Sequence, residues 1–372
     1  MQQEKRDIYL DHAATTPAAP QVIEAVAASM RSYAANPSAA YSEAGKARKE
    51  LRLAKETLSQ AIGCDRNELF FTSGGTEANN WVFHAHRGQH VVLSAIEHSS
   101  VIQAAEKNGC RCTLITPDRY GVIQPEAVAR AIQPDTKLIS VQAANNETGV
   151  IQPTEQIWAV AKQHRILFHC DAVQAFGHIP TDVKRIGCDL LSVSAHKLYG
   201  PRGIGFLYIR SGIALPAMLH GGGQENGRRS GTENIPAISG FRIAVDLALK
   251  DMHLREMREK LLLEQFISRL FAAVPACRLL GESALRVPGI CAIRIPGLPA
   301  EYAISKLDMQ GIMVSGGAAC ASHSAAPSHV YTAMGLTPEE AACVLRISPG
   351  RATTEEDMLT ACDALIGICK ER

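Results

Sequence analysis

The fold is constrained most by a regular alternation between short apolar runs and segments with helical periodicity. The runs are "ELFFTS", "HVVLSA", "CTLIT", "KLISVQAA", "ILFHCDA", "DLLSVSA" and "GIGFLYI", and stretches such as "PEAVARAI" and "TEQIWAVAKQH" separate them. Strands that alternate with helices indicate a mostly parallel sheet flanked by helices. The runs lack a polar side, as expected where both faces of a sheet are covered. The sequence therefore predicts an α/β fold.

The pattern changes from about Pro236 onward. A long helical stretch, "AISGFRIAVDLALKDMHLREMREKLLLEQFISRLFAAV", contains few helix-breaking residues, and its length suits a connector between two domains. The later runs "GICAIRIPG", "GIMVSGG" and "VLRISPG" predict strands of a smaller α+β domain. We therefore predict a large domain over residues 16–250 and a small domain formed by residues 1–15 and 251–372.

Composition excludes several classes of protein. Of the 372 residues 46% are hydrophobic and the formal net charge is +1, which argues against disorder and against an electrostatic nucleic-acid binder. The start, "MQQEKRDIYLDHAATTP", lacks the apolar run of a signal peptide, and no window approaches the roughly 20 apolar residues of a membrane helix. We expect a cytoplasmic protein with neither nucleic-acid nor membrane partners. The 11 cysteines form no CxxC pair, so most are expected to be buried apolar side chains, and no metal site is expected.

A candidate anion site lies in "FFTSGGTEANN", residues 70–80, which reads as a strand, a Gly-Gly turn and a helix that opens near Gly75 and Thr76. Glycines let a backbone approach an anion closely, and a helix N-terminus presents free N–H groups to it. A phosphate site is one interpretation, and an ordinary turn with a capping threonine is the other. The pattern of a P-loop is absent.

A second candidate is Asp171, at the end of the apolar run "ILFHCDA". A carboxylate at the rim of a hydrophobic core is costly unless a cation or strong donors satisfy it. A helix cap would satisfy Asp171, and so would the protonated ring nitrogen of a bound cofactor.

The third candidate is Lys197 in "LLSVSAHKLYGPRGIG". On a continuous strand Ser194 and His196 would share one face and Lys197 would point to the other. A lysine partly removed from water becomes a nucleophile toward aldehydes, although a side chain that reaches back to solvent is the simpler interpretation. The glycines that follow are expected to let the chain turn beside a bulky cofactor.

These three candidates converge on one cofactor. The anion site, the carboxylate and the lysine all follow strands, and ligands of such sheets bind where the strands end. Together they fit pyridoxal phosphate, which needs partners for its phosphate, its ring nitrogen and its aldehyde.

At these residues the sequence resembles the class V aminotransferase group of fold-type I pyridoxal phosphate enzymes, and more narrowly the cysteine desulfurases that supply sulfur for iron–sulfur clusters. The matching motifs follow the family's order over nearly the whole chain: "YLDHAATTP", "TSGGTEANN", "EHSSV", "NNETG", "DAVQAFG", "SAHKLYGPRGIG", "GGGQENGRRSGTEN", "VSGGAACASHSAAPSHV" and "LRISPGR". The resemblance implies a homodimer that converts L-cysteine to L-alanine, with sites shared across the interface.

The resemblance also implies roles for individual residues. Lys197 would bond to the cofactor aldehyde, Asp171 would hold the ring nitrogen, and His98 would stack over the ring and carry protons. Asn146 and Gln174 would lie near the ring's phenolic oxygen. The phosphate ligands would be Gly75, Thr76, Ser194, His196 and, from the neighbouring subunit, Thr232.

The substrate and sulfur-transfer residues follow from the same resemblance. Arg346, with Asn146, would bind the substrate carboxylate through a bidentate contact. The Cys320 thiolate would attack the substrate sulfur and keep it as a persulfide for an unidentified protein acceptor. His12 and Gly75 depart from common family residues, and the chain ends at "ALIGICKER", which puts contact with an assembly scaffold in doubt.

Two alternatives remain open. A selenocysteine or cystine lyase of the same group would share the cofactor residues, although a cystine lyase need not use a loop cysteine. A non-catalytic sulfur carrier or scaffold derived from such an enzyme predicts the loss of Lys197, Asp171 or Arg346, and all three are present.

Overall fold

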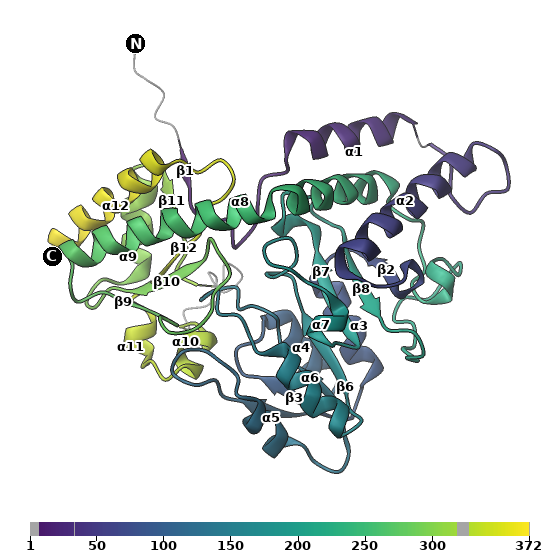
Figure 1. Cartoon of the computed structure of the whole chain (residues 1–372), viewed down its shortest axis with the longest axis horizontal. Coiled ribbons are helices and arrows are strands. Elements are labelled where there is room, and N and C mark those ends of the chain that lie inside the picture. Colours follow the sequence, from purple (N-terminus) through teal and green to yellow (C-terminus); the bar gives the residue numbers. More distant parts are fainter. Residues whose placement is uncertain (1–6, 33, 318–326, 372) are drawn as a thin grey trace.

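A computed structural model of the chain describes residues 7–32, 34–317 and 327–371. In this part the predicted α/β fold is confirmed: one sheet has the strand order β2-β8-β7-β6-β5-β3-β4, with helices around it (Figure 1). The neighbouring pairs from β7 to β4 are parallel, and β8 runs antiparallel to both β2 and β7. The strands are β2 (Leu69–Thr72), β3 (His90–Ser94), β4 (Arg111–Ile115), β5 (Thr136–Ser140), β6 (Leu167–Asp171), β7 (Leu190–Ser194) and β8 (Gly205–Ile209).

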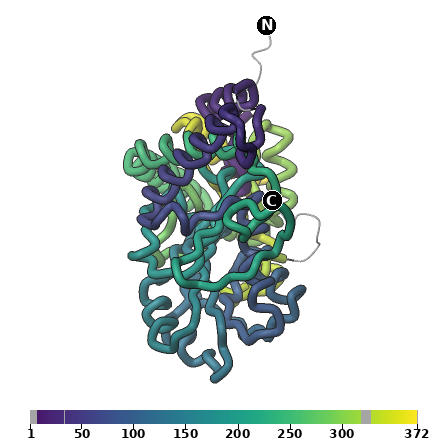
Figure 2. The backbone as a smooth tube through the Cα atoms, turned by 90° about the vertical axis from the view of Figure 1, so that its right-hand side faces the viewer, coloured from purple at the N-terminus to yellow at the C-terminus, as the bar shows by residue number. Residues whose placement is uncertain are grey.

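Helices alternate with the strands of this sheet, as the sequence pattern predicts. They are α3 (Gly75–Ala85), α4 (Ser99–Lys107), α5 (Pro125–Ala131), α6 (Thr154–Gln163) and α7 (Val183–Ile186), with short 3-10 turns η1 (Arg66–Glu68), η2 (Ala195–Lys197) and η3 (Glu225–Gly227). The N-terminal helices α1 (Pro20–Ser32) and α2 (Ala44–Ile62) pack on α8 (Ile235–Ala273). Figure 2 shows α1 at the end of the molecule opposite to α5 and α6.

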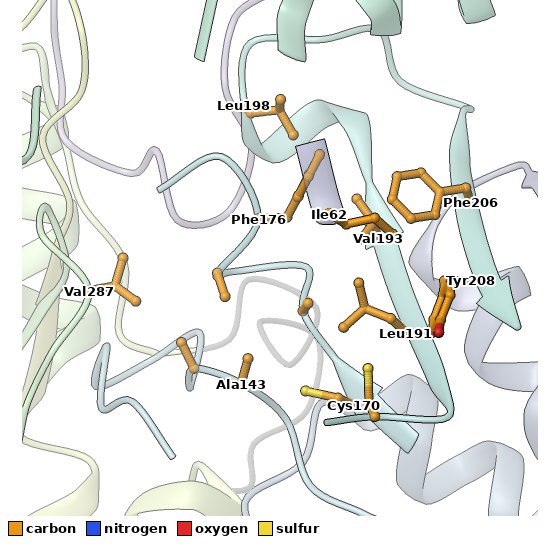
Figure 3. Packing of buried hydrophobic residues seen from close by; sticks show 14 of the residues in the cluster. Ile62, Ala143, Cys170, Phe176, Leu191, Val193, Leu198, Phe206, Tyr208 and Val287 are labelled. Atoms are coloured by element: carbon orange, nitrogen blue, oxygen red, sulfur yellow. The ribbon is translucent and has the colours of Figure 1, made fainter. Parts of the chain in front are cut away.

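The sheet is buried on both faces except at one edge. Buried side chains from its central strands pack with helix residues, and Figure 3 shows Phe176, Leu191 and Val193 gathered near Phe206. Strand β4 departs from the prediction that the apolar runs lack a polar side, because three of its five residues are exposed. Its position at the end of the strand order explains the difference, since an edge strand has a neighbour on one side only.

The C-terminal part forms smaller sheets. β12 (Val344–Ile347), β10 (Cys291–Arg294) and β9 (Arg278–Leu279) pair antiparallel, and the N-terminal β1 (Ile8–Tyr9) pairs in parallel with β11 (Ile312–Met313). The helices of this part are α9 (Ala300–Asp308), α10 (His329–Ala333), α11 (Pro338–Ala341) and α12 (Glu355–Lys370). The strand β1 therefore lies with the C-terminal strands.

The predicted long helix is confirmed as α8, which has 39 residues and runs along both parts of the molecule (Figure 1). Phe241 and Val245, near its start, belong to the same hydrophobic cluster as the large sheet, whereas Phe266 and Leu270 pack with the C-terminal strands. The domain boundaries at residues 15 and 250 stay a prediction.

Among the described residues, no helix combines the length and the apolar character needed to cross a membrane. The cytoplasmic location stays a prediction from the sequence.

Candidate functional site

Two adjoining cavities lie at the carboxyl ends of β6 and β7, beside the turn that precedes α3. The outer cavity has a volume of about 370 Å³ and the inner cavity about 170 Å³. Both are lined by Gly75, Thr76, Ser194 and His196. The inner cavity is also lined by His98, Asn146, Asp171, Gln174 and Lys197. The structure therefore brings together nine of the residues that the sequence analysis selected.

Lys197 differs from its predicted orientation. Strand β7 ends at Ser194, and Ala195–Lys197 form the 3-10 turn η2, so the alternation of a strand stops before the lysine. Ser194, His196 and Lys197 consequently face the same inner cavity. The prediction that Lys197 points away from Ser194 and His196 is wrong for this reason.

The amine of Lys197 is held by the backbone of the N-terminal segment. Its Nζ donates to the carbonyl oxygens of Ala13 and Ala14, at 2.6 and 2.8 Å. The backbone carbonyl of Lys197 itself lies 2.9 Å from Nε2 of His178, a partly buried histidine whose pKa is lowered to about 4, mainly by desolvation and then by Arg255. Both ends of the lysine are thus fixed.

Asp171 is the start of a hydrogen-bonded chain that ends at His98. Its Oδ2 accepts from Nδ2 of Asn79 at 2.8 Å, and its Oδ1 accepts from the backbone N–H of Val173 at 2.9 Å. The same Asn79 nitrogen donates to Oγ of Ser100 at 2.9 Å, and that hydroxyl lies 2.8 Å from Nδ1 of His98. The buried carboxylate and the imidazole are therefore positioned by one connected set of side chains.

The protonation state of His98 follows from its surroundings. Nδ1 accepts the backbone N–H of Ser100 at 3.1 Å, so a neutral ring carries its proton on Nε2. Burial lowers the pKa of His98, Lys197 and His329 lower it further, and Asp171 opposes them. His98 is therefore neutral at pH 7, and its Nε2 carries the N–H donor.

The outer cavity is formed around the glycine turn. Gly74 caps α3 with φ of 148°, a conformation that favours glycine. A Cβ added to Gly205 would lie only 2.8 Å from the Cα of Gly74. Glycine at these positions is thus required by the close approach of two backbones. The expectation that the glycines after Lys197 let the chain turn beside a cofactor stays a prediction. Thr72 Oγ1, not Thr76, closes the turn by donating to Gly74 at 3.0 Å.

The electrostatics of the outer cavity suit an anion. The first N–H groups of α3 have no partners within the helix, and the helix dipole adds positive potential there. His196 contacts Oγ1 of Thr15 at 3.1 Å, and its pKa is lowered to about 4, chiefly by burial and then by Lys197 and Arg202. Arg202, which also lines this cavity, supplies a permanent positive charge.

Arg346 lies beside the inner cavity but does not line it. Its Nη1 donates to the backbone oxygen of Asn146 at 2.9 Å, and its Nη2 contacts Oδ1 of Asp11 at 2.7 Å. The side chain is 1% exposed, and its Nε has no hydrogen-bond partner among the described residues. Gln174, which lines the inner cavity, donates to the carbonyl of Ala13 at 2.7 Å. The unpaired Nε of Arg346 therefore indicates an acceptor that the described residues do not supply.

Two predicted residues remain untested. Thr232 is exposed between η3 and α8 and lines neither cavity of its own chain. Cys320 lies outside the described residues.

Further groups of the site were not predicted from the sequence: the side chains of Asp11, Asn79 and Ser100 and the carbonyls of Ala13 and Ala14. Ser100 could have been found, because His98 precedes a helix and its N-cap position calls for hydrogen bonding to the second residue of α4. The two carbonyls could not, since a backbone oxygen leaves no mark on residue type.

Where two adjacent strands of a mostly parallel sheet end at a lysine and a buried carboxylate, with a helix N-terminus beside them, the arrangement is that of the fold-type I class of α/β enzymes. The chain belongs to the class-V aminotransferase family, whose sequence profile matches residues 8–360.

Individual relatives agree with this assignment. The cysteine desulfurase IscS of Clostridium botulinum is 40% identical to this chain, over 99% of the chain and 95% of that protein. A solved NifS-like protein from Rickettsia africae superimposes with a TM-score of 0.90 at 32% identity, over 98% of this chain and 99% of the other. A structure of SspA in complex with cysteine has a TM-score of 0.81 at 34% identity, over 91% and 98% of the two chains.

Proposed function

We propose that the protein is an L-cysteine desulfurase that converts L-cysteine to L-alanine and passes the sulfur on, for iron–sulfur cluster assembly or another sulfur-transfer route. The observation that carries the proposal is the convergence of the Lys197 amine, the Asp171 carboxylate and the N-terminus of α3 on two adjoining cavities. The family membership and the desulfurase relatives support the same activity.

Pyridoxal phosphate is the cofactor that we propose for these cavities, and their donor set fits it. The side-chain-free turn at Gly74, the hydroxyls of Thr76 and Ser194 and the first N–H groups of α3 suit a phosphate. Asp171, whose two oxygens accept from Asn79 and from the backbone of Val173, is positioned to accept a hydrogen bond from a protonated ring nitrogen. When bound, the cofactor supplies an electron-withdrawing ring that stabilises negative charge at the substrate's Cα.

The residues of the chain would handle the protons. Lys197 lies in the inner cavity with its amine resting on Ala13 and Ala14, from where it can take a proton from the substrate's Cα. His98 presents a neutral imidazole with its proton on Nε2, which suits it to donate a hydrogen bond within the same cavity. Arg346 would hold the substrate carboxylate.

The sulfur acceptor that we propose is Cys320, on the strength of the family resemblance. Its thiolate would attack the sulfur of L-cysteine, so that an S–S bond forms while the substrate's C–S bond breaks. The electron pair of the broken bond stays with the carbon skeleton, which gains a proton and leaves as L-alanine. An ordinary thiol of pKa about 8.5 is only ~3% thiolate at pH 7, so some activation is expected.

The decisive experiment supplies L-cysteine and a thiol reductant and measures sulfide and L-alanine. The wild type should release both in equal amounts, Lys197→Ala should release neither, and Cys320→Ala should lose sulfide release. Cys112→Ala, which changes an exposed cysteine on the edge strand β4, should behave as the wild type. Equal sulfide from Cys320→Ala would exclude the persulfide route, and pyruvate with ammonia in place of alanine would identify a lyase.

We also propose a homodimer in which Thr232 of each subunit completes the phosphate site of the other. We further propose that another protein accepts the sulfur from Cys320. A non-catalytic carrier is the weaker candidate, because Lys197, Asp171 and Arg346 are all present.

A further inference from the structure

Asp11 is anchored where the N-terminal segment crosses the end of β12. The residues on either side of it are fixed to Ser348: the backbone N–H of Ser348 donates to Leu10 at 2.8 Å, and that of His12 donates to Ser348 at 3.1 Å. The Ser348 hydroxyl accepts the N–H of Ala13 at 3.0 Å. Asp11 is therefore paired with Ser348, which follows Arg346 by two residues.

The Asp11 carboxylate occupies one edge of the Arg346 guanidinium. Nη2 of the arginine contacts Oδ1 of Asp11 at 2.7 Å, and Nη1 is bound to the backbone oxygen of Asn146 at 2.9 Å. The arginine is 1% exposed and the Asp11 side chain 18%, so bulk water screens this pair little. Two of the three nitrogens are thus in use, and Nε is the donor left without a partner among the described residues.

This arrangement has two opposite effects on an amino-acid carboxylate, if the proposed desulfurase function holds. Asp11 and Asn146 fix the guanidinium plane, so its remaining donors point in one direction and lose little freedom on binding. The Asp11 charge also opposes the arrival of a second carboxylate at the same guanidinium, since like charges a few ångströms apart in a poorly screened site repel.

We propose that Asp11 is a positioning and specificity residue, which orients Arg346 and limits its affinity for the carboxylates of substrate and product. A fully unopposed buried arginine would bind L-alanine too tightly for rapid release. A residue that lowers carboxylate affinity while keeping the donor geometry serves turnover.

The test uses the cofactor-loaded enzyme and two amine ligands, of which L-alanine has a carboxylate and 2-aminoethanethiol, the decarboxylated form of L-cysteine, has none. Titration calorimetry should show that Asp11→Asn, which keeps an oxygen acceptor for Nη2 and removes the charge, binds L-alanine roughly tenfold more tightly, a difference of ~1.4 kcal/mol. The dissociation constant of 2-aminoethanethiol should stay at the wild-type value. Asp11→Ser, a smaller neutral acceptor, should shift L-alanine binding in the same direction.

The control is Asp363→Asn, which removes the same charge from an exposed pair with Arg269 at 2.6 Å and should leave both constants unchanged. Unchanged or weaker L-alanine binding in Asp11→Asn would overturn the role of Asp11, as would an equal shift for both ligands. Failure of the desulfurase function itself would appear separately, as a wild type that releases neither sulfide nor alanine.

Discussion

At the scale of single residues, the site is organised less by the residues that carry the chemistry than by those that hold them. Asn79 donates to Asp171 and to Ser100 and so connects the carboxylate to His98. The Oδ1 of Asn79 is buried without a partner among the described residues, so only its Nδ2 fixes the side-chain amide. Lys197 and Asp171 could be selected from the sequence because their types are unusual at the ends of apolar runs, whereas His98 was implied only by the family resemblance. Asn79 could not, since an asparagine inside a helix is compatible with many surroundings.

Replacing Asn79 by alanine should therefore damage the site without removing a residue proposed for catalysis. One oxygen of the buried Asp171 loses its donor, and hydrogen bonds to charged groups contribute about 1.5–3 kcal/mol, so kcat/KM for L-cysteine should fall by roughly tenfold or more. The fluorescence titration of pyridoxal phosphate should show weaker binding in parallel. Asn67→Ala, at an exposed position, serves as the control. Unchanged cofactor affinity in Asn79→Ala would mean that Asp171 does not depend on this amide.

At the scale of elements, the hydrophobic periodicity of each segment correctly predicted the type of element that the segment forms. The strand and helix order and the length of α8 follow from periodicity, which each segment carries by itself. The 3-10 turn at Ala195–Lys197 was missed, because the residue type at a strand end does not reveal where the strand's hydrogen bonds stop. The exposed β4 was missed because edge positions depend on strand order, which no single segment encodes.

Helix α8 also carries a buried acid whose titration should be visible in stability. Burial raises the pKa of Glu259 to about 8, and Arg255, 3.8 Å away, opposes the rise together with Arg258 and Arg351. A carboxyl with a raised folded pKa stabilises the fold while it is protonated, and this contribution is lost as pH rises from its unfolded pKa near 4.5 through 8. Glu259 therefore contributes stability mainly on the acidic side of this window.

Glu259→Gln should remove that dependence. Measured by urea unfolding, the wild type should lose stability relative to the variant as pH rises from 5 to 8.5, by about 1.4 kcal/mol for each pH unit between the unfolded and the folded pKa of Glu259. Glu264→Gln, on the same helix and 60% exposed, should follow the wild type at every pH. A constant difference between wild type and Glu259→Gln over the whole range would contradict the raised pKa.

At the scale of the whole molecule, the N-terminal segment links the two parts at the site. Asp11 binds Arg346 of the C-terminal part, Ala13 and Ala14 accept from Lys197, and Thr16 Oγ1 donates to the carbonyl of His196 at 2.9 Å. The family motif "YLDHAATTP" could be recognised in the sequence, but its contacts are mostly backbone to side chain and join residues 180 to 335 positions apart. Their partners could therefore be found only in the folded structure.

The proposed dimer makes one further prediction at this scale, which a subunit-mixing experiment can test. If Thr232 completes the phosphate site of the opposite subunit, Thr232→Glu should place a negative charge beside the phosphate and abolish cofactor binding, and Lys197→Ala should prevent covalent attachment of the cofactor. In a mixed dimer one site combines both changes, whereas the other combines an intact Lys197 with an intact Thr232. Refolding the two variants together should then restore cofactor absorbance and sulfide release that neither variant has alone. Recovery would not occur if each chain formed its site from its own Thr232, because the only chain that keeps Lys197 would then also carry Thr232→Glu in the same site.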